Sequence, residues 1–591
     1  MSKKAIALCL LAVLVVCIVI ARRKQGRFSN RVVSETLIAR IDSSWIPESL
    51  IASPDARRVA YVDEVGKKQL VVVDANKQKK YDGIMAGSLM FSPDSKRVAY
   101  AARLGNKWFA VADGREGNKY DGIGQGTLLF SPDSQRLTYA ARIADKWFVV
   151  VDGQEGKKYH GMVTGTLIFS PDSKRVAYAA VQGDKRFVVV DGHEKNKYDG
   201  IGPGTLDFSP NSTRLAYAAR VGPNGRSPIP VSELWRYRFF LVLDEKEQEG
   251  YSGLGPFCGV PTAPKRLLGY SGIILSDDQL QVVDGTDENK YDGTRAPSII
   301  LRQLSKLVSV SGGLNRWHLA LDREVGEKCD HQAARTPIFS PDSKRVAYAA
   351  RVGTNQHAVV VDGKEGKPYD GIVRHTLLFS PDSNRVAYAA ERGNKPSVVV
   401  NGTEGKKYKH IQMGSLIFSA DSKRLAYVAG TGSRAVVVVD EKEGKRYPGG
   451  RSVTAPIFSP DSKRMAYVAQ TLRRMPNGEW RQTSFVVVDG KEEKKYSIAP
   501  GCPPIFSPDS KRLAYAAEVG GRNPKWFVVV DGEEGRRHDS WLEGKGGERY
   551  HVTHSRRFAF LLGTIVFDSP DRLHYLAQKR TRIYLVEETI K

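Results

Sequence analysis

The sequence contains few cysteines, and their positions exclude most chemistry that depends on thiols. There are five among 591 residues. Cys9 and Cys17 lie within an apolar run near the N-terminus, whereas Cys258, Cys329 and Cys502 are far apart in the chain. None of these spacings matches a zinc-binding pair or a disulfide framework. We therefore predict no cysteine metal site, and one disulfide among the last three cysteines remains open.

Recognisable catalytic motifs are missing as well. The stretches GYSGLG at 250–255 and GYSG at 269–272 lack the final spacing of a Gly-x-Ser-x-Gly elbow, and no phosphate-binding glycine loop is present. His551 and His554 are three residues apart, which places them on opposite faces of a strand. We predict that the protein is not an enzyme, with no catalytic residue, no metal and no cofactor.

Long hydrophobic runs are absent from all but one place. An uninterrupted apolar stretch at 5–21 follows two lysines and precedes Arg22, Arg23 and Lys24. This length suits a short membrane span, so residues 1–28 are predicted to contain one hydrophobic helix that acts as a signal anchor or a signal peptide. Positive charge on both sides leaves the orientation open. We expect a membrane-anchored or exported protein of the bacterial periplasm or cell envelope.

Acidic residues are too few to balance the basic ones. The chain has 90 Lys and Arg against 65 Asp and Glu, a net charge of +25. The excess is spread over the whole length, whereas a nucleic-acid-binding protein more often concentrates basic and aromatic residues on one surface. Nucleic acid is therefore an unexpected partner, and an anionic glycan or a lipid headgroup remains open.

A repeat of about 40 residues dominates the chain. The stretch FSPDSKRVAYAAR at 91–103 returns unchanged at 339–351. The first Ser of its SPD motif recurs at the positions Ser53, Ser92, Ser131, Ser170, Ser209, Ser340, Ser380, Ser419, Ser459, Ser507 and Ser569. Two decayed copies are expected between Ser209 and Ser340, at 262–270 and 304–312. This makes about thirteen units, and such a period with strand-like content indicates a propeller or solenoid.

Each unit reads as four short antiparallel strands. In the copy at 127–161, TLLFS is a short apolar strand, PDSQ a turn, RLTYAAR a second strand, KWFVVVDG a third and GKKYHG a polar fourth. The third strands lack hydrophobic–polar alternation, so both of their faces are expected to be buried. A sandwich would show one polar face, whereas blades stacked around a propeller axis are covered on both sides.

The FSPDS-K-R-hydrophobic-A-Y block followed by VVVDG resembles the WD40-like repeat of TolB-type proteins and of the propeller domain of prolyl-oligopeptidase-type enzymes. The resemblance covers the chain from about residue 51 to 583. It implies an all-β propeller fold and says little about function. The peptidase activity of the latter enzymes is not expected here, because no region remains that could hold a hydrolase domain.

Thirteen blades exceed the usual size of one ring. We therefore predict two tandem propellers, of about six blades at 31–296 and about seven at 297–591. The segment RVVSETLIARI at 31–41 reads as a lone strand. It is expected to complete either the first ring or the final blade, whose sequence supplies only three strands.

The repeated motif is interpreted as structural, because its copies are chemically alike. Function is then expected where the pattern breaks, in enlarged loops that combine Trp with Arg or Lys, the residue types that often anchor interfaces. The candidate partner-binding residues are Trp235, Arg236, Arg238, Arg473, Arg474, Trp480, Arg481 and Trp526. The leading hypothesis is a protein-binding scaffold. The alternative is a carbohydrate-binding propeller or a propeller-type glycan lyase or hydrolase.

Overall fold

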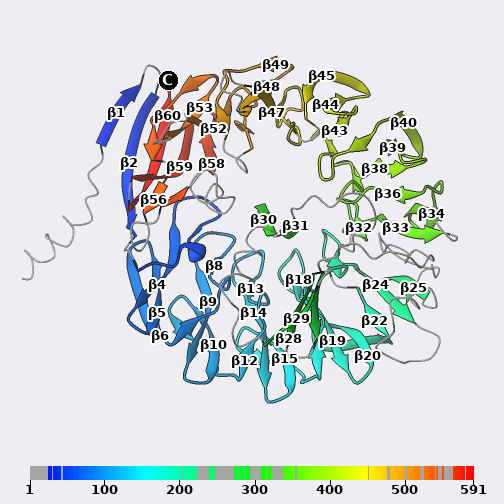
Figure 1. Ribbon diagram of the computed structural model, residues 1–591. Coiled ribbons are helices and arrows are strands. Elements are labelled where there is room, and N and C mark those ends of the chain that lie inside the picture. The colour runs from blue at the N-terminus through cyan, green and yellow to red at the C-terminus, as the bar shows by residue number, and fades with distance from the viewer. Residues whose placement is uncertain are drawn as a thin grey trace, which may run out of the picture. The chain divides into compact units, whose positions relative to one another are not determined.

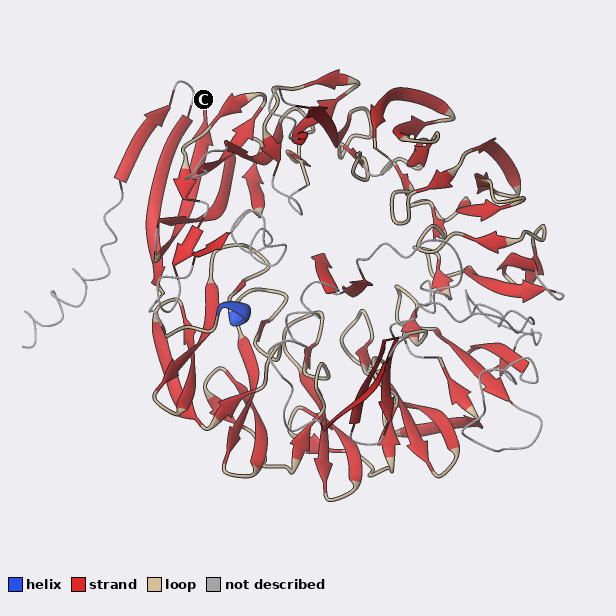
Figure 2. Cartoon of the chain, in the orientation of Figure 1, coloured by secondary structure: helices blue, strands red, loops and turns tan. Residues whose placement is uncertain are grey.

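The computed structural model is built almost entirely of strands (Figure 2). The single helix in the described part is the short 3-10 turn η1 (Pro47–Ser49). The residues that carry the predicted hydrophobic helix and all five cysteines lie outside the described part. The structure describes residues 24–28, 31–41, 44–202, 204–221, 238–244, 246–247, 272–276, 279–284, 287–292, 308–313, 316–321, 337–352, 356–449, 452–474, 480–498, 503–519, 525–539, 541–543, 549–551, 564–579 and 581–591.

The chain divides into two compact units. One unit, here called the propeller unit, comprises Met1–Ser227, Arg236–Phe257 and Gln332–Lys591. The second comprises Pro228–Trp235 and Cys258–His331. The described strands of the propeller unit form eleven antiparallel blades, numbered 1 to 11 in the order in which they follow one another.

Blade 1 consists of β3 (Ile51–Ala52), β4 (Val59–Val65), β5 (Lys68–Val73) and β6 (Asn76–Tyr81), and blade 2 of β7 (Gly83–Ile84), β8 (Met90–Phe91), β9 (Val98–Leu104), β10 (Lys107–Ala112) and β11 (Arg115–Glu116). Blade 3 consists of β12 (Gly122–Ile123), β13 (Leu129–Phe130), β14 (Leu137–Ile143), β15 (Lys146–Val151) and β16 (Gln154–Glu155). Blade 4 consists of β17 (Gly161–Met162), β18 (Ile168–Phe169), β19 (Val176–Gln182), β20 (Lys185–Val190) and β21 (His193–Tyr198).

Blade 5 consists of β22 (Gly200–Ile201), β23 (Asp207–Phe208), β24 (Leu215–Val221), β25 (Arg238–Leu243) and β26 (Lys246–Glu247), and blade 6 of β32 (Ile338–Phe339), β33 (Val346–Val352), β34 (Gln356–Val361) and β35 (Lys364–Glu365). Blade 7 consists of β36 (Gly371–Ile372), β37 (Leu378–Phe379), β38 (Val386–Glu391), β39 (Pro396–Val400) and β40 (Thr403–Lys407). Blade 8 consists of β41 (His410–Ile411), β42 (Ile417–Phe418), β43 (Leu425–Gly430), β44 (Arg434–Val439) and β45 (Lys442–Pro448).

Blade 9 consists of β46 (Ile457–Phe458), β47 (Met465–Arg474), β48 (Trp480–Val488) and β49 (Lys491–Glu492). Blade 10 consists of β50 (Ser497–Ile498), β51 (Ile505–Phe506), β52 (Leu513–Val519), β53 (Lys525–Val530), β54 (Glu533–Glu534) and β55 (His538–Asp539). Blade 11 consists of β58 (Ile565–Ser569), β59 (Arg572–Lys579), β60 (Arg582–Ile590), β2 (Arg31–Arg40) and β1 (Lys24–Phe28).

The predicted four-stranded unit is confirmed, with two refinements. In blade 3 the innermost strand is split into β12 and β13, which both pair with β14. The central hairpin β14–β15 runs from Thr138↔Val151 to Ile143↔Lys146. The expected polar fourth strand is reduced to β16 and a single bridge between Tyr159 and Trp147. The turn before it has positive φ at both Asp152 (51°) and Gly153 (82°), as a type I′ hairpin turn requires.

The N-terminal strand closes the last blade. Figure 1 shows blue strands β1 and β2 beside red strands β59 and β60, and β2 pairs with β60 along its length, from Arg31↔Ile590 to Arg40↔Arg582. Of the two expected roles for residues 31–41, the structure thus supports completion of the final blade. This pairing covers the edge of β60, which would otherwise present unpaired backbone groups.

The structure corrects the predicted number of blades from thirteen to eleven. Of the two decayed copies, 262–270 lies outside the described residues, and 304–312 overlaps a hairpin rather than a described blade. The described part of the second unit contains a three-stranded sheet of β27 (Gly272–Ser276), β28 (Gln279–Asp284) and β29 (Asp287–Asp292), and a hairpin of β30 (Val308–Gly313) and β31 (Arg316–Leu321). A further hairpin, β56 (Trp541–Glu543) with β57 (Arg549–His551), precedes blade 11.

Blades 5 and 6 are neighbours although 131 residues separate their SPD motifs. The backbone N–H of Asn211 donates to Ser343 Oγ at 2.9 Å, and Arg214 Nη1 donates to Lys344 O at 3.0 Å. The same contacts join other consecutive blades. The predicted boundary between two rings, at 296/297, lies outside the described residues, and the blades on either side of it belong to one unit.

The repeated motif is a turn that also binds the next blade. In blade 2, Ser92 Oγ donates to Asp94 Oδ1 at 2.6 Å and accepts the N–H of Arg97 at 2.9 Å, so the turn is stabilised by its own side chains. The N–H of Asp94 then donates to Ser134 Oγ of blade 3 at 2.9 Å. Ser134 has a φ of 67°, where glycine is the usual residue, and its hydroxyl supplies a contact that glycine lacks.

The arginine of the motif makes a second link between blades. Arg97 Nε donates to Asp113 Oδ2 of its own blade at 2.8 Å, while Nη1 donates to Ser134 O and Gln135 O of blade 3 at 2.9 and 2.8 Å. Its guanidinium also lies 5.1 Å from the ring centroid of Phe130. Equivalent bonds to the next blade's carbonyls are made by Arg58, Arg136, Arg214, Arg345, Arg424 and Arg464.

The hydrophobic core lies between blades rather than within one. Tyr81 of blade 1 contacts Tyr100 and Phe109 of blade 2, with ring centroids 6.2 and 5.6 Å apart. All three side chains are buried. The same arrangement returns with Tyr159, Tyr178 and Phe187 in blades 3 and 4. This explains why the third strands are apolar on both faces, as predicted.

We expect Arg97→Ala to lower the free energy of unfolding by about 1–3 kcal/mol, because two carbonyls of blade 3 and the Asp113 carboxylate lose their donor. Lys96→Ala is the matched control, since the neighbouring lysine side chain is 83% exposed. Urea unfolding followed by fluorescence measures both. Equal midpoints for the two variants would contradict the linking role of the arginine.

A second prediction concerns the closing blade, where Arg31 and Glu588 form an ion pair at 2.9 Å with side chains 1% and 0% exposed. Arg31→Met should cost about 3–5 kcal/mol, because it leaves a buried carboxylate without its counter-charge. Adding Glu588→Gln should recover part of this loss. If the double variant unfolds at the same urea concentration as the single one, the charge of Glu588 does not explain the cost.

Candidate functional site

The hairpin β47–β48 of blade 9 carries four of the predicted partner-binding residues. Central hairpins such as β14–β15 contain six residue pairs, whereas β47–β48 contains nine, ending at Arg473↔Arg481 and Arg474↔Trp480. Paired residues of an antiparallel ladder share a face, so Arg473 and Arg481 occupy facing positions on one side of the hairpin and Arg474 and Trp480 on the other. The structure therefore brings these four predicted residues together.

Of the other four predicted residues, two lie outside the described residues, one begins a strand and one is buried. Trp235 and Arg236 lie outside the described residues. Arg238 begins β25, where it pairs with Val221 at the end of the β24–β25 ladder.

The structure corrects the prediction that Trp526 is a partner-binding residue. Its side chain is only 1% exposed and belongs to the core between blades 10 and 11. Its indole Nε1 donates to Gln578 Oε1 of blade 11 at 3.3 Å. The sequence held a signal for this outcome, since the KWF that starts β53 also starts β10 and β15. There the tryptophans lie under arginines of their own blades, Arg103 over Trp108 and Arg142 over Trp147. Trp526 is thus a repeat residue rather than part of an enlarged loop.

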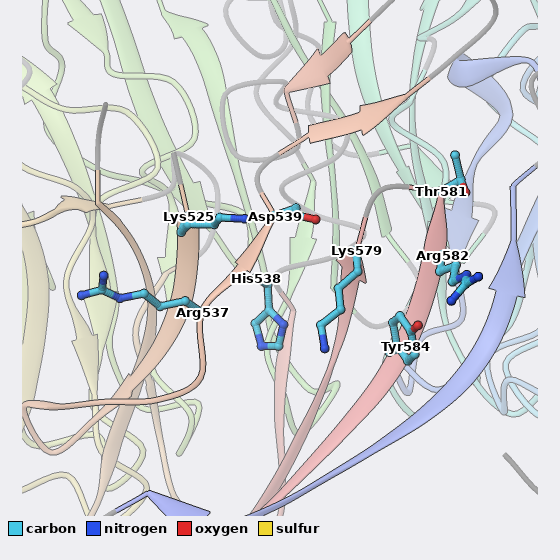
Figure 3. A pocket seen from close by; sticks show the side chains of 8 residues that line it. All are labelled: Lys525, Arg537, His538, Asp539, Lys579, Thr581, Arg582 and Tyr584. Atoms are coloured by element: carbon cyan, nitrogen blue, oxygen red, sulfur yellow. Dashed lines mark hydrogen bonds and ion pairs between the residues drawn. The ribbon is translucent and has the colours of Figure 1, made fainter. Parts of the chain in front are cut away.

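A cavity of about 580 Å³ lies between blades 10 and 11 (Figure 3). Blade 10 contributes Lys525 on β53 and the segment 537–539, and blade 11 contributes residues from the end of β59 and the start of β60. The lining residues are Lys525, Arg537, His538, Asp539, Lys579, Thr581, Arg582 and Tyr584. Four of these carry positive charge and one carries negative charge, so the cavity is basic.

Most cations of the cavity already have a carboxylate partner. Lys525 pairs with Asp539, Lys579 Nζ lies 2.8 Å from Glu35 Oε2, and Arg537 Nη2 lies 3.2 Å from Glu534 Oε2. Arg582 makes no ion pair with any residue of the described part. Arg582 is also exposed at the cavity, so its charge is available to a ligand.

His538 connects the cavity to a buried polar chain. Tyr575 Oη donates to Glu588 Oε1 at 2.7 Å, and Glu588 Oε2 accepts from Arg31 at 2.9 Å. His538 Nε2 lies 3.2 Å from the Tyr575 oxygen. Because the single Tyr575 proton is directed to Glu588, the network assigns the imidazole proton to Nε2. Burial, together with the nearby Lys579, Arg536 and Lys525, lowers the pKa of His538 to about 3, so the ring is neutral.

The cavity residues were not among the sequence predictions, although one signal marks them. His538 stands at the position that tyrosine occupies in the other repeats, for example Tyr120, Tyr159, Tyr369 and Tyr496. The backbone pairing is the same, since Trp526 pairs with His538 as Trp147 pairs with Tyr159. A residue that departs from the repeat within a core position would have identified this site.

The described ranges also bear on metal binding and on membrane crossing. No group of three or more His, Cys, Asp and Glu residues in the described ranges is arranged to hold a metal ion. Within those ranges there is also no helix with the length and apolar character needed to cross a bilayer. The apolar run at 5–21 lies outside them.

Comparisons with known proteins give structural likeness only. No family model matches the chain, and no curated protein matches it. A eukaryotic initiation factor structure is 14% identical with a TM-score of 0.29, covering 74% of this chain and 95% of its own. The tricorn protease is 12% identical with a TM-score of 0.22, covering 90% of this chain and 55% of its own.

TolB from Acinetobacter baumannii, the type of propeller whose repeat the sequence resembles, is also among the matching structures. It is 17% identical with a TM-score of 0.19, covering 42% of this chain and 65% of its own. Because all of these TM-scores are below 0.5, the propeller assignment rests on the strand pairing itself.

The neutral His538 predicts an acid-sensitive fold. Its folded-state pKa lies below the ordinary 6.5, so the unfolded chain takes up a proton between pH 6.5 and 3 that the folded chain does not. The contribution of the neutral His538 ring to the free energy of unfolding is therefore fully present above pH 6.5. As the pH falls below 6.5, the free energy of unfolding decreases by at most about 1.4 kcal/mol per pH unit. Urea midpoints from pH 8 to pH 4 should therefore fall more steeply for the wild type than for His538→Tyr, which restores the residue of the other repeats. Parallel profiles would contradict the assignment.

Proposed function

We propose that this protein is a non-catalytic propeller scaffold, and that the extended hairpin of blade 9 binds an acidic surface of a protein partner. The observation that carries the proposal is the facing pair Arg473↔Arg481, next to Arg474↔Trp480, at the end of the longest central hairpin described. Trp and Arg are the residues most enriched among those that dominate binding energy at protein interfaces.

The arginine pair favours an acidic partner on energetic grounds. Like charges at facing positions of an antiparallel ladder destabilise it, so this pair costs the free protein stability. A carboxylate placed between two guanidinium groups offsets that repulsion and forms charge-assisted hydrogen bonds. The three residue pairs that β47–β48 has beyond the six of β14–β15 are also consistent with a role outside the core.

The location of the scaffold is proposed from the apolar run at 5–21, which suits membrane anchoring or export. We place the protein at the bacterial cell envelope, with the propeller in the periplasm. Fractionation with protease protection of the native protein tests this location. Recovery of the propeller in the soluble cytoplasmic fraction would overturn it and would leave the binding proposal to be judged by its own experiment.

The binding proposal predicts that Arg481→Glu weakens partner capture by at least tenfold and, unusually, raises stability. Replacing the like-charge pair by an opposite-charge pair should add about 0.2–1 kcal/mol to the free energy of unfolding. Quantitative crosslinking in the native host, combined with urea unfolding of the purified variants, measures both quantities.

Arg481→Lys is the matched control, because it keeps the charge and should retain most of the capture. Unchanged capture by Arg481→Glu would contradict the proposal. So would equal losses with Arg481→Glu and Arg481→Lys, since charge would then not matter.

A further inference from the structure

The cavity between blades 10 and 11 contains a buried hydrogen-bond acceptor that no described residue uses. His538 is 1% exposed, and its Nδ1 atom has no hydrogen-bond partner among the residues that the structure describes. Since the ring proton is on Nε2, where it faces the Tyr575 oxygen, Nδ1 carries a lone pair. A buried polar atom left without a partner costs stability, and native structures rarely keep one without a reason.

The same cavity also offers two cationic groups of blade 11. Arg582 begins β60 and has no ion-pair partner in the described part of the chain. Lys579 Nζ forms an ion pair with Glu35 Oε2 at 2.8 Å and lies 5.3 Å from the centroid of the Tyr584 ring. Figure 3 shows Lys579 between His538 on one side and Arg582 and Tyr584 on the other. A ligand reaching all of these groups would bridge the last repeat blade and the closing blade.

These groups restrict the chemistry of a ligand. The cations favour an anionic group, for which the arginine fork is the stronger site. The Nδ1 lone pair favours a hydrogen-bond donor and repels an anion at the same point. An inorganic anion therefore satisfies one half of the cavity, and a neutral sugar satisfies the other half. A volume of about 580 Å³ falls within the range of small-molecule sites.

We propose that this cavity binds a small polyhydroxylated anion, a sugar acid or a sugar phosphate, with its charge at Arg582 and Lys579 and a hydroxyl donating to His538 Nδ1. The site is distinct from the blade 9 hairpin, so it does not depend on the protein-binding function. Within the repeats, the position of His538 is otherwise a tyrosine, whose ring packs between blades and whose hydroxyl is buried in copies such as Tyr120 and Tyr159. The exchange for histidine replaces this hydroxyl, which can donate or accept, by a nitrogen that can only accept.

Isothermal titration of the full chain with four probes tests the proposal: glucuronate, glucose 6-phosphate, glucose and inorganic phosphate. We expect at least one of the two sugar anions to bind, and both glucose and phosphate to bind at least tenfold more weakly than that anion. Whichever sugar anion binds more tightly identifies the anionic group. No binding by either sugar anion, or equal binding of phosphate and the sugar anions, would overturn the proposal.

Two variants locate the site. His538→Tyr, which restores the residue of the other repeats, and Arg582→Gln, at an exposed position, should each weaken binding of the preferred sugar anion at least tenfold. Arg572→Gln is the matched control, because Arg572 is an exposed residue of β59 that does not line the cavity. Equal affinities for the wild type and Arg582→Gln would overturn the assignment even if His538→Tyr failed to fold.

Discussion

The structure depends on one repeated contact, between the SPD turn of each blade and the backbone of the next. The motif leaves few of its polar groups free for other chemistry. Ser92 Oγ stabilises its own turn, while the Arg97 guanidinium and the Asp94 backbone amide bond the next blade. A series built in this way needs a partner for its last blade. Strand β2 provides it by pairing with β60, and His574 Nε2 of the same blade lies 2.6 Å from Asp55 O of blade 1.

The fold could be predicted from the sequence because the evidence for it is local and repeated. The apolar third strands, the Asp-Gly turns and the period of about 40 residues all indicate stacked four-stranded blades. The number of blades could not be predicted, because residues 258–331 are long enough for two copies but form a three-stranded sheet and a hairpin in the described part. The sequence left open which blade residues 31–41 complete, since a strand's partner is set by tertiary pairing rather than by local pattern.

Candidate functional residues were predictable only where they interrupt the repeat by insertion. The enlarged loop at 470–485 led to Arg473, Arg474, Trp480 and Arg481, which the β47–β48 ladder brings together. Trp526 misled because its neighbouring loop is long while the residue itself belongs to the repeated core. His538 was missed because it is a substitution rather than an insertion. In a homogeneous repeat, a single exchange at a buried position is therefore as informative as an added loop.

The central claim is that the repeats form one series of blades, in which blades 5 and 6, on either side of residues 248–336, are adjacent. Spin labels at Thr213 and Lys344 test it directly, in a variant whose native cysteines are replaced. These positions are equivalent in blades 5 and 6, as Lys174 and Thr213 are in blades 4 and 5. The account predicts the same narrow distance distribution for both pairs in pulsed electron paramagnetic resonance. A longer or broader distribution for Thr213 and Lys344 would contradict it and would favour two separate rings.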